Sequence, residues 1–280
     1  MLVRDGLAKG KTRAANALAN LARNPDYRVA IVNKDGIDPL ILLVRSGIEE
    51  GKAQAAGALM YLASNSSSFR SKIADKGGIE PLISLLRDGT AKGKIAAVGM
   101  LSTLAINDTN KTKLAEEGVI DPLVLLLRDG SPEGKAKAAG VLKTLTHRNV
   151  GKVGMKIFDK GGVEPLILEP LVLQVRNGTA KGKTAAACAL KNLANISASH
   201  RNTIIDGGAI GALLALLRDG NAAGKKTAAS TLSSFATRKS VRDRIRREGL
   251  GIIEHALQEA TNNDTSAQGP IEDLMKNLRE

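Results

Sequence analysis

A Gly-Lys dipeptide recurs about every 42 residues, and this repetition constrains the fold more than any other feature of the chain. The copies begin at Gly10, Gly51, Gly93, Gly134, Gly182 and Gly224, at spacings of 41, 42, 41, 48 and 42 residues. Similar residues surround each copy, for example GGIEPLISLLRDGTAKGKIAAVGMLSTLA at residues 77–105. A unit of this length buries its apolar surface only against neighbouring copies, so the spacing predicts a solenoid.

Each repeat predicts three helices. The first is short, as at residues 110–117. The second begins at a proline such as Pro39, capped by Asp38, and is apolar nearly all round. It ends at a glycine such as Gly47, expected in the left-handed conformation. The third helix starts at Thr90 or its equivalent and carries small and apolar residues at helical spacing, and since no segment alternates with period two, the fold class is all-α.

The array is expected to span residues 1–250 in about six repeats, with a partial repeat and capping helices at 251–280. The opening MLVRDG matches the tail of a second helix, so the first repeat is truncated. The apolar side of its third helix then has little cover, which predicts either a longer protein or another molecule at that end. Near residues 164–173, EPLIL is followed by EPLVL, an insertion expected to bend the stack.

Composition narrows the functional classes. Apolar residues make up 43% and charged residues 25%, as in soluble globular proteins. Aromatic residues are only 2%, which disfavours binding of nucleic acids by base stacking. The single cysteine, Cys188, excludes an internal disulfide and favours a reducing compartment, so we expect an intracellular, cytoplasmic protein. The longest apolar stretches are far shorter than the roughly 20 residues of a transmembrane helix.

No constellation of catalytic or metal-binding residues emerges from the sequence. The segment GTAKGKT at residues 178–184 resembles a phosphate-binding loop, but that motif needs one more residue between its glycines and a preceding strand. We expect the glycine instead to let a neighbouring helix approach. The histidines, His147, His200 and His255, lie in different repeats without metal-ligand spacing. The expectation is therefore no enzymatic activity, no cofactor, no metal and no small-molecule substrate.

The repeated sequence pattern, with LLRDG followed by Gly-Lys and an alanine-rich helix, resembles the armadillo repeat over residues 1 to about 250. It is most similar to the yeast vacuolar and the plant and algal armadillo proteins. The resemblance implies a right-handed α-solenoid, an α–α superhelix whose third helices line a concave groove. It also implies that the chain binds other proteins.

Groove residues can be named by counting from the glycine of Gly-Lys as zero. Positions 3, 6, 10 and 13 share the face opposite the buried stripe. The groove residues predicted from this count are Arg13, Asn16, Asn20, Tyr61, Thr103, Lys137, Thr144, Asn192 and Ser234. In importin-alpha-like members, position 6 is Trp and position 10 is an Asn that clamps a peptide; here that Asn occurs only at Asn20 and Asn192 and the Trp nowhere. Small residues at position 6, such as Gly57, either form a smooth floor or ease packing between repeats.

Positive charge gathers in the turns between second and third helices. These turns carry +11 of the net charge of +13 in 53 of the 280 residues. They define a predicted basic rim whose lysines are Lys9, Lys11, Lys92, Lys94, Lys135, Lys181, Lys183, Lys225 and Lys226. The rim either steers an acidic partner toward the groove or keeps the protein soluble.

Three functions follow as alternatives. The first is a scaffold that binds an acidic or amphipathic segment of a protein partner. The second is a structural subunit of a larger complex. The third is an importin-alpha-like adaptor, or a binder of nucleic acid or an anionic membrane surface; the scarcity of aromatic residues and the lack of a base-reading motif disfavour nucleic acid.

Overall fold

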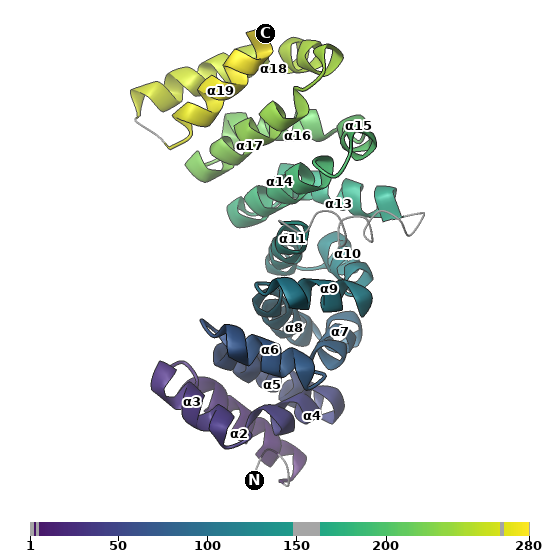
Figure 1. Ribbon diagram of the computed structural model, residues 1–280, viewed down its shortest axis with the longest axis vertical. Coiled ribbons are helices and arrows are strands. Elements are labelled where there is room, and N and C mark those ends of the chain that lie inside the picture. Colours follow the sequence, from purple (N-terminus) through teal and green to yellow (C-terminus); the bar gives the residue numbers. More distant parts are fainter. Residues whose placement is uncertain (1–2, 4–5, 148–162, 264–265, 280) are drawn as a thin grey trace. The chain divides into compact units, whose positions relative to one another are not determined.

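The computed structural model describes residues 3, 6–147, 163–263 and 266–279, and every regular element in them is a helix (Figure 1). The predicted all-α class is therefore confirmed. Contacts divide the chain into two compact units, residues 1–144 and 145–280, which are treated separately below. Within the described residues, no helix combines the length and apolar character needed to cross a membrane.

The first unit contains successive helical triplets. Its helices are α2 (Ala8–Leu21), α3 (Pro25–Asn33), α4 (Ile37–Ser46), α5 (Glu49–Ala63), α6 (Ser67–Asp75), α7 (Ile79–Asp88), α8 (Ala91–Leu104), α9 (Asp108–Glu116), α10 (Ile120–Asp129) and α11 (Pro132–Thr146), which reaches two residues past the unit boundary. The first repeat contributes α2, the second α3 to α5, the third α6 to α8 and the fourth α9 to α11. Third helices α2, α5 and α8 pack side by side, as do second helices α4, α7 and α10.

The second unit repeats this arrangement and then departs from it. Its helices are α13 (Val163–Asn177), α14 (Ala180–Ala194), α15 (Ala198–Asp206), α16 (Ala209–Asp219), α17 (Ala222–Phe235), α18 (Lys239–Asn262) and α19 (Gln268–Arg279). Helices α13 and α14 belong to the fifth repeat and α15 to α17 to the sixth. Helix α17 packs against α14 on one side and α19 on the other.

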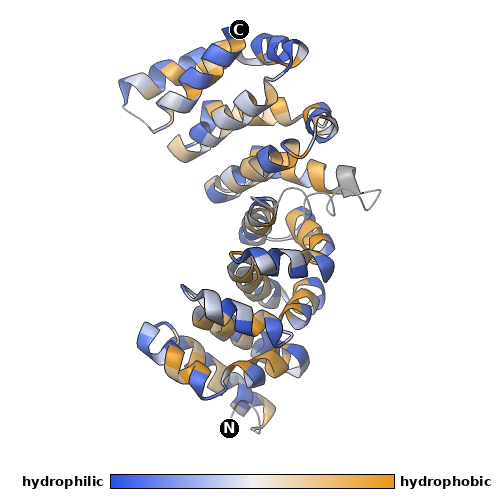
Figure 2. Cartoon of the chain, in the orientation of Figure 1, coloured by the Kyte–Doolittle hydropathy of each residue, from blue (hydrophilic) through white to orange (hydrophobic). Residues whose placement is uncertain are grey.

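The core lies between second and third helices. Leu82 and Leu86 of α7 are buried, as are Ala97 and Leu101 of α8, the helix against which α7 packs. Figure 2 shows α7 and α10 as mostly hydrophobic, in contrast to α9. Truncating one such leucine to alanine costs about 2–5 kcal/mol. Alanine-rich third helices approach one another closely, because alanine adds little bulk between neighbouring backbones.

Second helices begin earlier than predicted. Helix α4 begins at Ile37, so Pro39 is its third residue, and its N-cap is Gly36 rather than Asp38. Proline is tolerated there because the first backbone N–H groups of a helix have no intrahelical partner. Asp38 does not cap; its carboxylate accepts a hydrogen bond from Lys76 Nζ of the next repeat at 2.6 Å.

The glycine that ends each second helix was also wrongly predicted as left-handed. Gly89 has φ −73° and ψ 168°, which is extended backbone. Its glycine identity follows from space instead, because a Cβ there would lie 2.5 Å from the carbonyl oxygen of Leu85. The left-handed glycines lie before the second helix instead, in the loop that joins the first helix to it, as at Gly77 (φ 74°) and Gly118 (φ 83°).

The insertion near residues 164–173 lengthens a helix. Helix α13 has 15 residues where α7 has 10, and the inserted segment is continuous with the repeat-derived part. Pro170 lies inside α13, at the position that Pro81 occupies near the start of α7. A proline inside a helix removes one backbone hydrogen bond, so it marks the join between the inserted and the repeat-derived residues.

The C-terminal end departs from the repeat pattern. Helix α18 has 24 residues and runs from the basic residues 239–247 into the segment predicted as a partial repeat. The boundary expected after residue 250 therefore falls within one helix. Gly249 permits this helix to pack on α16, because a Cβ there would lie 2.3 Å from Leu214 Cδ2. Helix α19, in the segment predicted to cap the array, buries Ile271, Leu274, Met275 and Leu278.

Candidate functional site

Side-chain caps hold the turn before four of the third helices, whereas α2 and α5 have no side-chain cap. Thr90 Oγ1 accepts a hydrogen bond from the backbone N–H of Gly93 at 3.2 Å, and Ser131 Oγ accepts one from Gly134 at 3.2 Å. In the second unit, Thr179 and Asn221 cap α14 and α17 in the same way. In these four repeats the cap fixes where the helix begins, so the lysine of Gly-Lys falls in its first turn.

The glycine of Gly-Lys serves packing, as predicted. A Cβ on Gly93 would lie 2.9 Å from Leu85 Cδ1, and one on Gly134 would lie 3.0 Å from Leu126 Cδ1. In the second unit, a Cβ on Gly224 would lie 3.0 Å from Leu216 Cδ1. The glycine therefore lets the second and third helices of one repeat close on each other. Gly10 is the exception, with nothing within 4 Å of its Cβ position.

The rim lysines lie in unlike surroundings. Lys9, Lys92, Lys181 and Lys226 are exposed, and Lys11, Lys94, Lys135, Lys183 and Lys225 are half-buried. In the second unit, Lys225 Nζ pairs with Glu259 Oε2 of α18 at 2.6 Å. In the first, Lys52 pairs with Glu49 of its own helix at 2.8 Å. The positive charge of the turns is therefore neutralised to different degrees from repeat to repeat.

Carboxylates of the repeated Arg-Asp-Gly also lie near this rim. The pKa of Asp129 is lowered mainly by its hydrogen bonds to Arg128 and more weakly by Lys135. The pKa of Asp219 is lowered mainly by Arg218, with smaller contributions from Lys183 and Lys225. The rim is thus a mixed surface with an excess of lysine rather than a continuous basic strip.

The predicted groove residues all lie outside the core. In the first unit, Arg13, Asn16 and Asn20 are exposed, and Tyr61, Thr103, Lys137 and Thr144 are half-buried. In the second unit, Asn192 and Ser234 are half-buried. Partial exposure on successive third helices is the placement that contact with another molecule requires.

Several of these side chains already have partners within the chain. Thr103 Oγ1 and Thr144 Oγ1 donate to the carbonyl oxygens of Gly99 and Gly140 in their own helices, at 3.1 and 2.9 Å. The guanidinium of Arg23 lies 5.3 Å from the centre of the Tyr61 ring, a cation–π contact.

The remaining polar positions are also engaged. Lys137 Nζ lies 3.6 Å from Glu133 Oε1, and Ser234 Oγ donates to the carbonyl of Thr231 at 2.7 Å. Asn192 Nδ2 donates to Thr146 Oγ1 at 3.2 Å, within the second unit. An amide held by a neighbour in this way differs from a free peptide clamp.

The small residues at position 6 divide between the two interpretations given above. A Cβ on Gly57 or Gly140 would meet nothing within 4 Å, so these two glycines leave open floor. Gly99 is different, because its Cβ position lies 3.1 Å from Met60 Sδ. Packing therefore explains Gly99 alone among the three.

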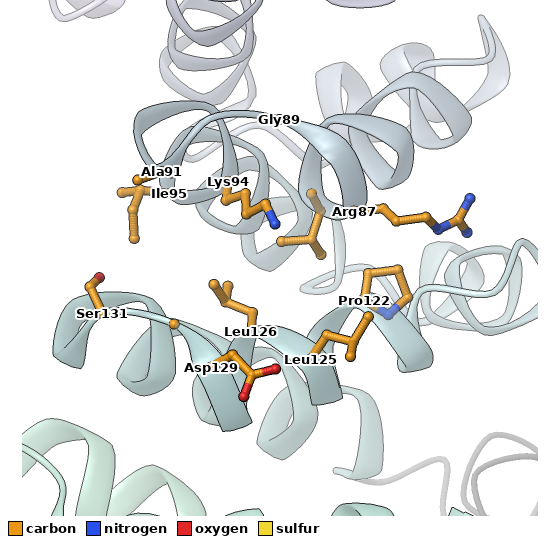
Figure 3. A pocket seen from close by; sticks show the side chains of 12 residues that line it. Arg87, Gly89, Ala91, Lys94, Ile95, Pro122, Leu125, Leu126, Asp129 and Ser131 are labelled. Atoms are coloured by element: carbon orange, nitrogen blue, oxygen red, sulfur yellow. The ribbon is translucent and has the colours of Figure 1, made fainter.

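Sequence reasoning missed a pocket in the first unit, between the third and fourth repeats (Figure 3). Its volume is about 430 Å³. Its lining comes from the end of α7, the start of α8, α10 and the turn before α11. The lining includes the cations Arg87 and Lys94, the carboxylate of Asp129, and Ala91, Pro122, Leu125 and Ser131. No sequence signal singles the pocket out, because the repeat position of Ala91 is alanine in other repeats too, as at Ala180.

Comparison with known proteins assigns the family. The family model described as "Plant U-box protein ARM repeat region" matches residues 40–255. The chain is an armadillo-repeat protein. A search of curated proteins gives no match. The narrower likeness of this armadillo array to the yeast vacuolar protein stays a prediction.

Several solved structures that are similar to this armadillo protein are engineered proteins. One engineered protein is 26% identical with a TM-score of 0.85, and the match covers 99% of this chain and 66% of that one. The designed armadillo repeat protein YIII(Dq)4CqI is 23% identical with a TM-score of 0.75, over 84% of this chain and 97% of that one. The designed armadillo repeat protein YIII(Dq.V1)4CPAF was solved in complex with the peptide (KR)4. It is 24% identical with a TM-score of 0.73, over 84% of this chain and 96% of that one. These likenesses confirm the armadillo solenoid fold.

Proposed function

We propose that this armadillo-repeat protein is a non-enzymatic scaffold that binds a segment of a partner protein along its third helices. The observation that carries the proposal is the open floor at Gly57 and Gly140, which lies beside the half-buried side chains of Tyr61 and Thr144. Such a surface admits the side chains of a partner segment without displacing core residues. The solved complex of a designed armadillo protein with the peptide (KR)4 supports this use of the fold.

The partner segment is acidic in this proposal. The charged side chains at groove positions 3, 6, 10 and 13 are Arg13, Arg23 and Lys137, and none of these positions carries a carboxylate. The rim adds lysines such as Lys92 and Lys181, both exposed. An excess of positive charge speeds association with an acidic segment and makes it dependent on salt.

The test uses a short fluorescein-labelled polyglutamate peptide and fluorescence anisotropy. Reversing the charge of three rim lysines, as K135E/K181E/K226E, should weaken binding at least about tenfold at low salt and flatten its salt dependence. The control, K34E/K72E/K239E, changes the net charge equally at lysines away from the rim. Equal loss in both variants would show that net charge alone attracts the peptide, and the rim proposal would then fail.

A second candidate is a structural subunit of a complex, favoured by exposed apolar residues near α2 and α3. Leu7 is 87% exposed, and Tyr27 and Val29 are each about half exposed. Exposed apolar side chains gathered near one end of an array favour contact with another protein surface. Light scattering over a range of concentrations tests this: the wild-type chain should self-associate or aggregate, and L7S/V29S should remain monomeric. A monomeric wild-type chain at every concentration removes the candidate.

A further inference from the structure

The repeats form equivalent junctions that can be compared with one another. Between the second and third repeats, Glu49 lies in the first turn of α5. One of its carboxylate oxygens accepts from Lys52 Nζ at 2.8 Å, and the other accepts from the backbone N–H of Thr90 at 3.4 Å. Thr90 is the N-cap of α8 in the next repeat. The chain therefore binds its own carboxylate at this junction, between a lysine and a helix N-terminus.

The next junction has the same receptor groups without the carboxylate. Lys94 corresponds to Lys52, and Ser131 corresponds to Thr90, three residues before the glycine of Gly-Lys. The residue that corresponds to Glu49 is Ala91. A methyl group thus stands where the preceding repeat supplies an acid.

The space at this junction is larger and more apolar. The pocket between the third and fourth repeats has a volume of about 430 Å³, against about 180 Å³ at the preceding junction. Leu125 lines it where Ser84 lines the smaller one, and Leu125 is 45% exposed. Figure 3 shows Lys94 extending into the gap toward Leu126, with Pro122 and Leu125 on the same wall.

The charge of the pocket is positive. In the described part of the chain, neither Lys94 nor Arg87 forms an ion pair, whereas Asp129 is held by Arg128 through contacts of 2.8–3.0 Å. At the preceding junction, by contrast, Arg45 lies 3.6 Å from Glu80 and Lys52 is paired with Glu49. The lining therefore combines two cations and one carboxylate, Asp129, which Arg128 already holds, with exposed apolar carbon.

We propose that this pocket binds an acidic residue of the partner segment together with an adjacent branched apolar residue. The carboxylate takes the place that Glu49 holds at the preceding junction, next to Lys94 and the backbone N–H of Ser131. The apolar side chain covers Leu125 and Pro122. This inference rests on the proposed function, because it takes its ligand from the same acidic partner, and it specifies one anchor site among the repeats.

The probe is the capped dipeptide acetyl-Leu-Glu-amide, added to the full chain with methyl groups labelled for NMR. The expected result is saturable shifts of the Ile95, Leu125 and Leu126 methyl signals. Acetyl-Leu-Gln-amide keeps the shape and loses the charge, so it should bind about tenfold more weakly. Equal shifts from both dipeptides would overturn the assignment of a carboxylate site.

Two variants test directly whether the pocket binds a carboxylate as the preceding junction binds that of Glu49. Ala91→Glu gives the third repeat the side chain of Glu49, so it should fill the site with the chain's own carboxylate and abolish the shifts. Ala180→Glu makes the same substitution at the same position of α14, where the residue is exposed, and should leave them unchanged. Both variants place an acid in the first turn of a helix, where it is tolerated. Undiminished shifts in Ala91→Glu would overturn the inference.

The two proposals fail separately. None of the three rim lysines changed above lines the pocket. If the rim variant loses polyglutamate binding while acetyl-Leu-Glu-amide leaves the pocket methyl signals unmoved, the scaffold proposal stands and the anchor site is refuted. If the dipeptide binds but the rim variant behaves like its control, the anchor site stands and the rim is refuted.

Discussion

Adding one methyl group at two glycines of the first unit, Gly89 and Gly140, should change stability in opposite directions. Gly89 ends α7 in extended backbone, a conformation that alanine adopts without strain. A Cβ there would nevertheless lie 2.5 Å from the carbonyl oxygen of Leu85 and 2.7 Å from its Cδ1. Gly140 lies inside α11, where a Cβ would meet nothing within 4 Å.

The expected magnitudes follow from these distances. At Gly89 the closer atom belongs to the backbone of a buried helix, so the clash cannot be relieved by a rotamer change, and overpacking of this kind costs about 1–3 kcal/mol. At Gly140 the change replaces glycine by the best helix former and gains up to about 1 kcal/mol. The free energies of unfolding of Gly89→Ala and Gly140→Ala should therefore differ by about 1–4 kcal/mol.

Urea unfolding followed by far-ultraviolet circular dichroism measures this difference, provided that both variants keep the wild-type m value. Gly57→Ala repeats the test, since Gly57 has the same repeat position and the same open space as Gly140. Destabilisation by both Gly57→Ala and Gly140→Ala would refute the claim that the floor is open. A neutral Gly89→Ala would refute the steric account of the helix end.

Two further predictions concern a buried arginine and a partly desolvated carboxyl group. Arg70 is buried and donates to Asn107 Oδ1 at 2.7 Å and to the carbonyl of Ala63 at 3.2 Å, so Arg70→Ala should lose about 1–3 kcal/mol in urea unfolding and Arg70→Lys should not restore it. Burial raises the pKa of Glu117, with a smaller contribution from Glu80, so this carboxyl binds its proton more tightly in the folded state. Its destabilising effect appears as pH rises from its ordinary pKa through its raised folded pKa. Glu117→Gln should therefore raise the midpoint of thermal unfolding at neutral pH and leave it unchanged in acid, and a shift of equal size at both pH values would contradict this assignment.

Much of the fold could be predicted from the sequence because each local sequence pattern occurs in several repeats. The period, the alanine stripe and the caps at Thr90 and Thr179 all follow from local chemistry that six copies reinforce. The conformation of Gly89 was not accessible in this way. The third, fourth and sixth repeats each carry a glycine before and after the second helix, and choosing which one is left-handed requires knowing that a carbonyl such as that of Leu85 closes on the second.

The candidate site was less predictable than the fold because it depends on contacts between repeats. Counting from Gly-Lys placed residues such as Tyr61 and Thr103 outside the core, where the structure has them. Counting did not reveal that the hydroxyl groups of Thr103 and Thr144 donate hydrogen bonds to carbonyl oxygens of their own helices. The pocket beside Lys94 was missed for a related reason, since its volume depends on α7 and α10 as well as on α8.

The Gly-Lys lysine is the constant part of every junction, and the carboxylate is the variable part. Lys52 receives an acid from its own helix, Lys225 receives one from the following helix α18, and Lys183 acts on Asp219 of the next repeat. For Lys94 the described chain supplies none. In a solenoid built from copies, a junction without its own acid can bind a carboxylate from outside, because the receptor groups are already in place. Specificity in such an array then depends on which junctions carry their own carboxylate, and placing one at Ala91 should close the site without altering the fold.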